Sequence, residues 1–278
     1  MERAVQPQQD IRDIIFAPIS RRPYTAELSV EHGGVVTGTA RLADQLSALG
    51  VSLEMEVADG AEVAAGATVA RLTGTPKQLA LAEEVAVGLL AKPSGIATAA
   101  RRAVELAGPE LKIVCGAWKK MPPEIKWIVR EAVAAGRASF RISDRPFLYL
   151  DKNFVQMLGG IEATMAAVAA MDDKIKCIQL KGRFAAVAEE ALAAVRSGAD
   201  ILMIDTGRLA DVETVNGALA KAGLRDKVQI AFAQGIHLED IPTLRGKGID
   251  ILDIGGSIID APLLDMRLDV RGEAGRCS

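Results

Sequence analysis

Basic side chains follow or end several short apolar runs in the C-terminal two thirds of this chain. They are Lys119, Lys120, Arg141, Lys152, Lys181 and Arg183. Arginine offers paired hydrogen bonds to carboxylates and phosphates, and lysine offers a compact positive charge. The formal net charge is -3, so these cations predict a local basic pocket for an anionic ligand. The alternative for any single lysine is an ordinary loop residue in water.

Glycines and one aspartate add to this candidate pocket. Gly235 follows one of the last two apolar runs, and Gly255, Gly256 and Ser257 follow the other. Backbone N–H groups of such loops bind phosphate in barrel proteins, although two tight turns would give the same pattern. Asp205 ends the run ILMID and is a candidate Mg²⁺ ligand. Asp205 could also cap the helix expected after it, and both roles could hold.

The elements that position these residues alternate between short apolar runs and helical segments. The expected strands cover residues 112–115, 146–150, 176–180, 201–204, 228–232 and 249–254. Strands that alternate with helices predict a parallel sheet, here an open (β/α) barrel of about six or seven strands. The carboxyl ends of barrel strands carry the chemistry, and Gln179 joins the candidate residues at these ends.

The first third of the chain is predicted to be β-rich, with strands near residues 25–30, 34–39 and 51–57. Its glycine turns also resemble biotinyl or lipoyl carrier domains, but no lysine lies between Val57 and Ala70 to carry the group. Residues 82–98 predict a helix that stops at Lys92-Pro93 and restarts after Ser94-Gly95. Its apolar stripe could pack on a partner or on the chain's own barrel.

The composition restricts the class of protein. The charge balance gives no support for nucleic-acid binding, and no apolar run reaches membrane-spanning length. The N-terminus lacks the apolar stretch of a signal peptide, and three scattered cysteines indicate a reduced, cytoplasmic protein. We expect an N-terminal arm at 1–22 and a disordered tail at 273–278.

Several motifs resemble those of the quinolinate phosphoribosyltransferases along nearly the whole chain. The turn at 94–98, SGIAT, is present without change. Lys119-Lys120 stand where the family has arginine and lysine, Arg141 matches the arginine of Asn-His-Arg, and Lys152 matches the lysine of Ile-Lys-x-Asn. SGADILMID, which ends in Asp205, and KGIDILDIGGS match two further strands of the family.

The resemblance implies two domains, an active-site-sharing dimer and a reaction. The expected domains are an α/β sandwich at 23–110, completed by 262–272, and a TIM-like α/β barrel at 111–261. Members of the family join quinolinate to phosphoribosyl pyrophosphate with Mg²⁺, and they release pyrophosphate and CO₂ on the path to NAD. Lys119, Arg141, Lys152 and Gln179 would then contact the aromatic acid. Lys120 and Asp205 would act in catalysis, with Asp205 on the metal, and Gly235, Gly255, Gly256 and Ser257 would hold the 5′-phosphate.

Departures from the family pattern leave other functions open. Glu84 replaces an arginine, Phe140 replaces a histidine, Gln179 or Cys177 falls where the Glu-Val-Glu carboxylates lie, and Ala231 replaces a further glutamate. Ala233-Gln234-Gly235 replaces Ser-Gly-Gly. Two other hypotheses therefore stay open beside the quinolinate enzyme. The first is a phosphoribosyltransferase (a pentosyltransferase) with a different acceptor, and the second is a non-catalytic homologue. Such a homologue would bind a phosphorylated ligand or a partner protein.

Overall fold

The computed structural model describes residues 10–275, which fall into two compact units. The first unit contains the chain up to Thr98 together with the segment from Pro262 onward, and the second is Ala99–Ala261. The division lies inside helix α3 (Pro76–Ala107), twelve residues before the boundary expected at 110/111. Residues 276–278 of the expected tail lie outside the described residues, but Glu273 is the last residue of a strand and does not belong to a tail.

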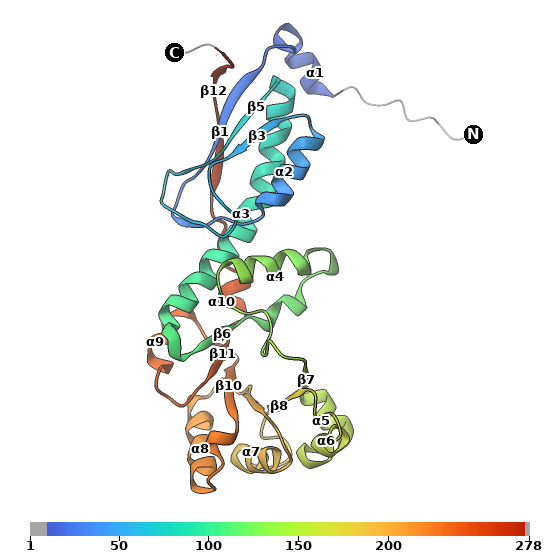
Figure 1. The fold of residues 1–278 in the computed structure, drawn as a ribbon, viewed down its shortest axis with the longest axis vertical. Coiled ribbons are helices and arrows are strands. Elements are labelled where there is room, and N and C mark those ends of the chain that lie inside the picture. Colours follow the sequence, from blue (N-terminus) through green and yellow to red (C-terminus); the bar gives the residue numbers. More distant parts are fainter. Residues whose placement is uncertain (1–9, 276–278) are drawn as a thin grey trace, which may run out of the picture. The chain divides into compact units, whose positions relative to one another are not determined.

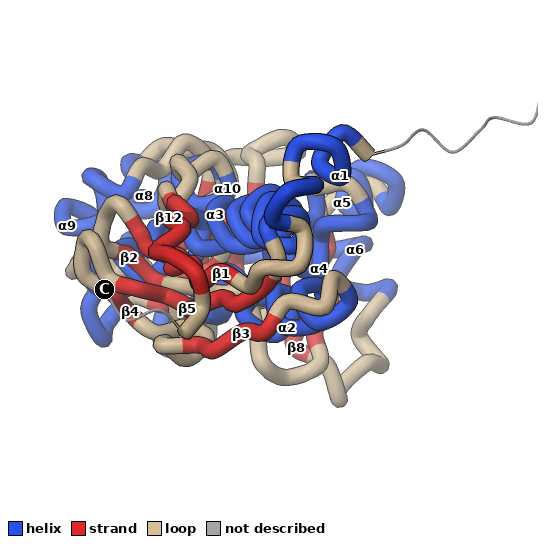
Figure 2. The backbone as a smooth tube through the Cα atoms, turned by 90° about the horizontal axis from the view of Figure 1, so that it is seen from above, coloured by secondary structure: helices blue, strands red, loops and turns tan. Residues whose placement is uncertain are grey.

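The first unit is built on a four-stranded antiparallel sheet with the order β12-β1-β5-β3. Its strands, side by side in Figure 2, are β1 (Tyr24–Val30), β3 (Ser52–Met55), β5 (Thr68–Gly74) and β12 (Met266–Glu273). A two-stranded ribbon joins β2 (Gly34–Val35) to β4 (Glu62–Val63). The expected strand at 34–39 is shorter than predicted because helix α2 (Thr39–Ala48) begins at its end.

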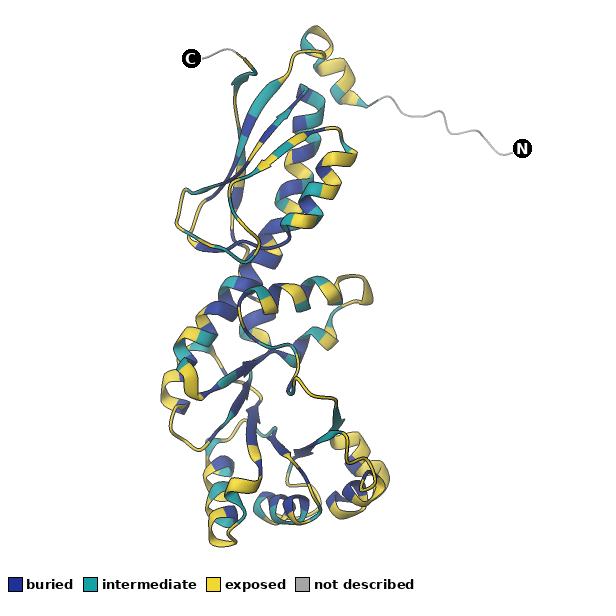
Figure 3. Cartoon of the chain, in the orientation of Figure 1, coloured by how far each residue is buried: buried dark blue, intermediate teal, exposed yellow. Residues whose placement is uncertain are grey.

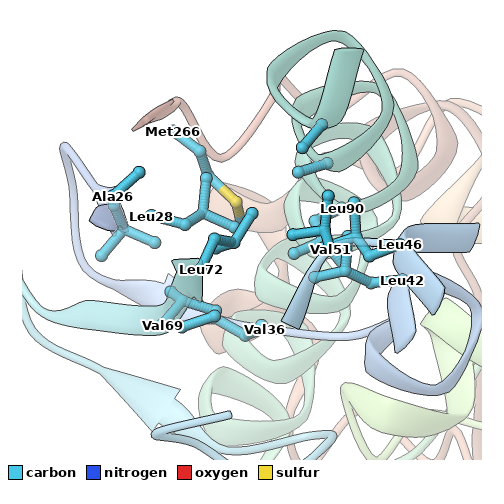
Figure 4. Close-up of a cluster of buried hydrophobic side chains, with 14 of the residues drawn as sticks. Ala26, Leu28, Val36, Leu42, Leu46, Val51, Val69, Leu72, Leu90 and Met266 are labelled. Carbon is cyan, nitrogen blue, oxygen red and sulfur yellow. The ribbon is translucent and has the colours of Figure 1, made fainter. Parts of the chain in front are cut away.

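One face of this sheet is apolar and packs against α2 and α3 (Figure 1). Alternation along the strands turns Leu28 and Leu72 to that face, where they join Leu42 and Leu46 of α2 and Leu90 of α3 (Figure 4). The opposite face is charged. Arg71 pairs with Glu27 and Glu56 across the strands, and Arg271 also pairs with Glu27. Two short helices, α1 (Ile11–Ile15) and η1 (Ala17–Ile19), precede the sheet.

Helix α3 is continuous through the segment where we expected it to stop, so that prediction is wrong. Pro93 cannot donate to the carbonyl of Leu89, which weakens the helix there. The turn is held from outside instead. The Thr98 hydroxyl accepts the N–H of Val35 at 2.8 Å, and the Ser94 hydroxyl accepts the N–H of Thr37 at 3.1 Å. The SGIAT residues are therefore helical, and they fix the segment that leads into α2.

The second unit is a six-stranded parallel sheet with the order β6-β11-β10-β9-β8-β7, which confirms the open barrel. The strands are β6 (Lys112–Val114), β7 (Phe147–Leu150), β8 (Ile175–Leu180), β9 (Ile201–Ile204), β10 (Gln229–Ala233) and β11 (Ile251–Asp253). Beyond β6, Ser139 makes a single parallel bridge with Val114. The strands are largely buried, whereas the helices that connect them expose one side to solvent (Figure 3).

Helices follow the strands in the βα order that the sequence predicts. They are α4 (Lys126–Ala135), α5 (Lys152–Leu158), α6 (Ile161–Ala167), α7 (Val187–Arg196), α8 (Leu209–Lys221), α9 (Ile241–Leu244) and α10 (Gly256–Ile259). Short 3-10 turns complete the connections: η2 (Gly108–Glu110), η3 (Gly116–Lys120), η4 (Pro123–Ile125), η5 (Arg225–Lys227) and η6 (Leu238–Asp240). The concave face of the sheet is lined by Val114, Cys177, Met203, Ala231 and Ile251. Cys177 and Ala231 are fully buried on this face.

Candidate active site at the carboxyl ends of the parallel strands

The carboxyl ends of β8 and β9 bring three predicted site residues together. The Gln179 side chain is buried, and its Oε1 accepts the backbone N–H of Lys152 at 2.7 Å. Its amide nitrogen donates to Oδ2 of Asp205. Gln179 therefore ties the start of α5 to the end of β9. Gln179 therefore positions neighbouring groups through both ends of its amide, and its expected contact with the aromatic acid stays a prediction.

Asp205 is also paired with a cation from the neighbouring strand end. Nζ of Lys181 lies 2.9 Å from Oδ2 of Asp205 and also donates to the Asp205 carbonyl. Both side chains are about four-fifths buried, with 20% and 22% of their surface exposed. The following helix, α8, has Arg208 at its N-cap, so the alternative role of Asp205 as the cap of that helix is wrong. Asp205 instead helps to fix an ammonium group at the mouth of the half-barrel.

Lys119 and Arg141 lie over two aromatic rings of one strand. Nζ of Lys119 is 5.5 Å from the ring centre of Tyr149, and the Arg141 guanidinium is 5.4 Å from that of Phe147. Phe147 and Tyr149 are two residues apart on β7, so both rings face the concave side of the sheet. Both cations are exposed, and they form a basic rim above the aromatic edge of the sheet. Lys152 is exposed at the first position of α5.

Asp253, at the end of β11, is a site residue that the sequence reasoning missed. Its Oδ1 accepts the N–H of Gly116 at 2.8 Å. Burial raises the pKa of the Asp253 carboxyl, and the nearby lysines Lys119 and Lys120 oppose that shift. Period-2 alternation was the available signal, because Ile251 lies on the concave face and Asp253 follows two residues later.

The two predicted phosphate-binding loops, which follow β10 and β11, are joined by a hydrogen bond. Gly235 adopts a left-handed φ of 72° after β10, and Gly255 and Gly256 begin α10 after β11. The Ser257 hydroxyl donates to the carbonyl of Ile236 at 3.2 Å and so joins the two loops. No side chain lies within 4 Å of the position that a Cβ of Gly235 would take. This loop therefore presents open backbone to a ligand.

Cys115 and Cys177 are buried, and neither thiol has the lowered pKa of a reactive nucleophile. Burial raises the pKa of the Cys115 thiol to about 12 and raises the pKa of Cys177 as well. Because the thiolate is the reactive form, neither residue is poised for covalent chemistry at neutral pH. The site therefore offers charged side chains in fixed positions, such as Lys181 and Asp205, and accessible backbone at Gly235.

Family models match both parts of the chain. The quinolinate phosphoribosyl transferase N-terminal domain matches residues 13–94, and the C-terminal domain matches residues 96–269. The chain belongs to the quinolinate phosphoribosyltransferase family.

Curated relatives and solved structures agree with this membership. A probable nicotinate-nucleotide pyrophosphorylase [carboxylating] of Methanothermobacter thermautotrophicus is 24% identical, over 94% of this chain and 98% of its own length. The nicotinate-nucleotide pyrophosphorylase [carboxylating] of Rattus norvegicus is 28% identical, over 96% of this chain and 89% of its own. The nicotinate-nucleotide pyrophosphorylase structure from Pyrococcus furiosus superposes with a TM-score of 0.81 at 20% identity, covering 99% of this chain and 80% of that chain. The superposition shows the shared fold.

Glu84 and Phe140 replace an arginine and a histidine of the family pattern, and both contact other residues of this chain. Glu84 lies on α3 with 67% of its side chain exposed, and it pairs with Arg12 of α1. Phe140 belongs to a stack in which the Arg130 guanidinium lies 3.7 Å from the ring centre of Trp118 and 6.0 Å from that of Phe140. The carbonyl of Phe140 also accepts the indole N–H of Trp118 at 2.8 Å. Phe140 thus shapes the loop next to Arg141.

The expected Mg²⁺ ligand, Asp205, contacts other residues of the protein. Among residues 10–275, no group of three or more His, Cys, Asp or Glu side chains could hold a metal. Mg²⁺ is bound through oxygen ligands, commonly one or two carboxylates with waters and substrate phosphates. The Asp205 carboxylate already bonds to Lys181 and Gln179 through one oxygen. The Mg²⁺ expectation therefore stays a prediction.

No helix within the described part of the chain is both long enough and apolar enough to cross a bilayer.

Proposed function

We propose that this chain is a carboxylating nicotinate-nucleotide pyrophosphorylase. It would transfer the phosphoribosyl group of phosphoribosyl pyrophosphate to quinolinate and yield nicotinate mononucleotide, pyrophosphate and CO₂ for NAD synthesis. The observation that carries the proposal is the family match over both domains, combined with a basic mouth at the carboxyl ends of the half-barrel. None of the comparisons favours a different acceptor or a non-catalytic role.

The aromatic acid would bind at the rim over β7. Lys119 and Arg141 carry positive charge above Tyr149 and Phe147, and Lys152 adds a third cation from the start of α5. Two carboxylates of a pyridine ring would meet these cations, and arginine can hold a carboxylate through two hydrogen bonds. The ring nitrogen would then face the ribose carbon that it attacks.

Catalysis in this site would be positioning and charge stabilisation. The bond from the anomeric carbon to pyrophosphate breaks as the ring nitrogen bonds to that carbon, and the ribosyl centre passes through an oxocarbenium-like state. Lys120 would stabilise the leaving pyrophosphate, and Asp205 would hold the neighbouring cation in place. Open backbone at Gly235, with Gly255, Gly256 and Ser257 shaping the neighbouring loop, would receive the 5′-phosphate.

The test is acceptor-dependent release of pyrophosphate from phosphoribosyl pyrophosphate. Quinolinate should support turnover, whereas nicotinate and a reaction without acceptor should not. Lys119→Ala and Arg141→Ala should each raise KM for quinolinate at least about tenfold, since each removes a charged contact. Turnover with nicotinate alone would reject the quinolinate assignment, and absence of turnover with both acids would reject the reaction.

We further propose that the chain works as a homo-oligomer, of which a homodimer is the simplest form. Helix α1 exposes Ile11, Ile14 and Ile15, each with more than half of its surface in solvent. Beside it, an open apolar groove of about 300 Å³ is lined by Phe16, Ile19, Tyr24, Pro76, Leu79, Ala80, Glu83, Leu268 and Val270. Exposed apolar surface of this kind is typical of contacts between subunits.

A further inference from the structure

Arg130 of α4 is a cation that aromatic rings hold in place. Its guanidinium carbon lies 3.7 Å from the ring centre of Trp118 and 6.0 Å from that of Phe140. The shorter separation is that of a guanidinium stacked on a ring face, whose N–H groups point outward in its own plane. The rings therefore fix the position of this cation without using its hydrogen-bond donors.

The donors of Arg130 have no acceptor within residues 10–275. Its Nε is buried without a hydrogen-bond partner, whereas neither terminal nitrogen is buried in this way. No ion pair or hydrogen bond engages the terminal nitrogens in the described residues, so their N–H groups reach solvent. A half-buried cation without an acceptor costs free energy, which contact with an anion would offset.

The stack joins the two segments that carry the expected acid-binding cations. Trp118 directly precedes Lys119, and Phe140 directly precedes Arg141. The indole N–H of Trp118 donates to the Phe140 carbonyl at 2.8 Å, so the segments are tied together at this point. Arg130 therefore lies next to the basic rim over β7.

Lys119 and Arg141 share the character of Arg130. Each lies over an aromatic ring, 5.5 Å from the ring centre of Tyr149 and 5.4 Å from that of Phe147. Neither forms an ion pair with a carboxylate in the part of the chain that the structure describes. Neighbouring cations that are held by rings and not by acids favour a ligand with more than one negative charge.

Quinolinate, the proposed acceptor, carries two carboxylates. An arginine binds a carboxylate through two parallel N–H···O bonds, whereas a lysine offers one compact charge. The proposed acceptor contacts include a single arginine, Arg141, which can hold one carboxylate in this way. Arg130 supplies a second guanidinium with free terminal N–H groups beside it.

We propose that Arg130 binds one carboxylate of the acceptor and so sets the preference of the site for an aromatic acid with two carboxylates over an acid with one. The inference rests on the proposed function. It makes Arg130 a substrate-binding residue, and it gives Trp118 and Phe140 the role of holding its guanidinium.

The experiment measures binding of quinolinate and of nicotinate to the full chain by calorimetry, without the phosphoribosyl donor. The wild type should bind quinolinate at least about tenfold more tightly, because quinolinate makes one more charged contact. Arg130→Gln should weaken quinolinate binding at least about tenfold and nicotinate binding by less than about twofold, so that the preference is lost.

Two further variants complete the test. Arg130→Lys keeps the charge and the long side chain but not the paired donors, and it should weaken quinolinate binding alone, by about threefold. Arg196→Gln is the matched control, because Arg196 is an exposed arginine in the last turn of α7, which leads to the amino end of β9. It should keep the wild-type affinities for both acids.

A purely structural role for Arg130 gives a different result. Both of its variants would then bind the two acids more weakly by the same factor, with a lower melting temperature, and this would overturn the inference. Unchanged quinolinate affinity in Arg130→Gln, or a wild type without a preference for quinolinate, would also overturn it. The proposed function fails separately: quinolinate binding that depends on Arg130 as expected, but without release of pyrophosphate from phosphoribosyl pyrophosphate, would support the inference and reject the transferase.

Discussion

The site is made of residues that mostly contact one another. Lys181, Asp205 and Gln179 form a connected set across β8 and β9, and Gln179 extends it to the first residue of α5. Such a network keeps charged groups at a fixed geometry, which is the form of electrostatic stabilisation that costs no reorganisation during the reaction. The sequence placed most of these residues at strand ends but could not show their pairing, because each partner comes from a different strand.

Asp253 provides a pH-dependent test at the residue scale. Burial raises its pKa in the folded state above the unfolded value of about 3.9. The folded protein therefore binds the proton more tightly, and the stability contribution of Asp253 is present below about pH 4 and is lost as the pH rises through the raised pKa.

Asp253→Asn should remove this loss, so the variant should gain stability relative to the wild type as the pH rises from 4 toward neutrality. Urea unfolding at several pH values measures the difference. Asp226→Asn, at an exposed carboxylate of the same unit, should show no such gain. A stability difference between the wild type and Asp253→Asn that is constant over pH would refute the assignment.

Helix α3 is the element for which the sequence predicted a break that the structure does not contain. A proline after Lys92 argued for a break, and the local argument is sound because Pro93 lacks an N–H. The helix continues because buried residues on both sides of Pro93 keep it packed, among them Leu90 and Ala97, and because Ser94 and Thr98 bond to the backbone of the preceding ribbon. These contacts join residues that are far apart in the sequence, so no local sequence pattern predicts them.

The parallel strands, in contrast, were predictable almost to the residue. Short apolar runs that follow a glycine turn, such as ILMID and ILDIG, are long enough for a buried strand and too short for a helix. Residues 201–204 and 229–233 are strands in the structure, against expectations of 201–204 and 228–232. Asp253 was missed because its run was treated as uniformly buried instead of alternating between two faces.

Two glycines of α3 give a matched test of the close packing at the SGIAT turn. A Cβ on Gly95 would lie 2.0 Å from the carbonyl oxygen of Pro262, whereas a Cβ on Gly88 would meet nothing within 4 Å. Gly95→Ala should therefore destabilise the chain by about 3 kcal/mol through overpacking. Gly88→Ala should stabilise it by up to about 1 kcal/mol, since alanine is the better helix former. Equal effects in denaturant unfolding would show that the Gly95 backbone does not approach Pro262.

At the scale of the whole molecule, both units belong to one enzyme family, while several individual site residues depart from its pattern. Gln179 and Ala231 stand at positions where the resemblance implies carboxylates. Such changes are compatible with the fold, because Gln179 and Ala231 lie on the concave face, Phe140 lies in a loop and Glu84 is exposed on α3.

The proposed homodimer is tested by mass. Sedimentation velocity should give about twice the 29.3 kDa of one chain at micromolar concentration. Ile14→Asp should lower that mass, because it places a charge on the exposed apolar face of α1. A monomer for the wild type would contradict the proposal, and a dimer unaffected by Ile14→Asp would place the interface elsewhere.

The central claim is the transfer of a phosphoribosyl group to quinolinate with loss of one carboxyl group. The most direct measurement follows quinolinate labelled at the 2-carboxyl carbon, together with phosphoribosyl pyrophosphate, and quantifies all three products in one reaction. The proposed reaction yields labelled CO₂, pyrophosphate and unlabelled nicotinate mononucleotide in equal amounts. Pyrophosphate release with no labelled CO₂, or no product at all at saturating substrates, would contradict it.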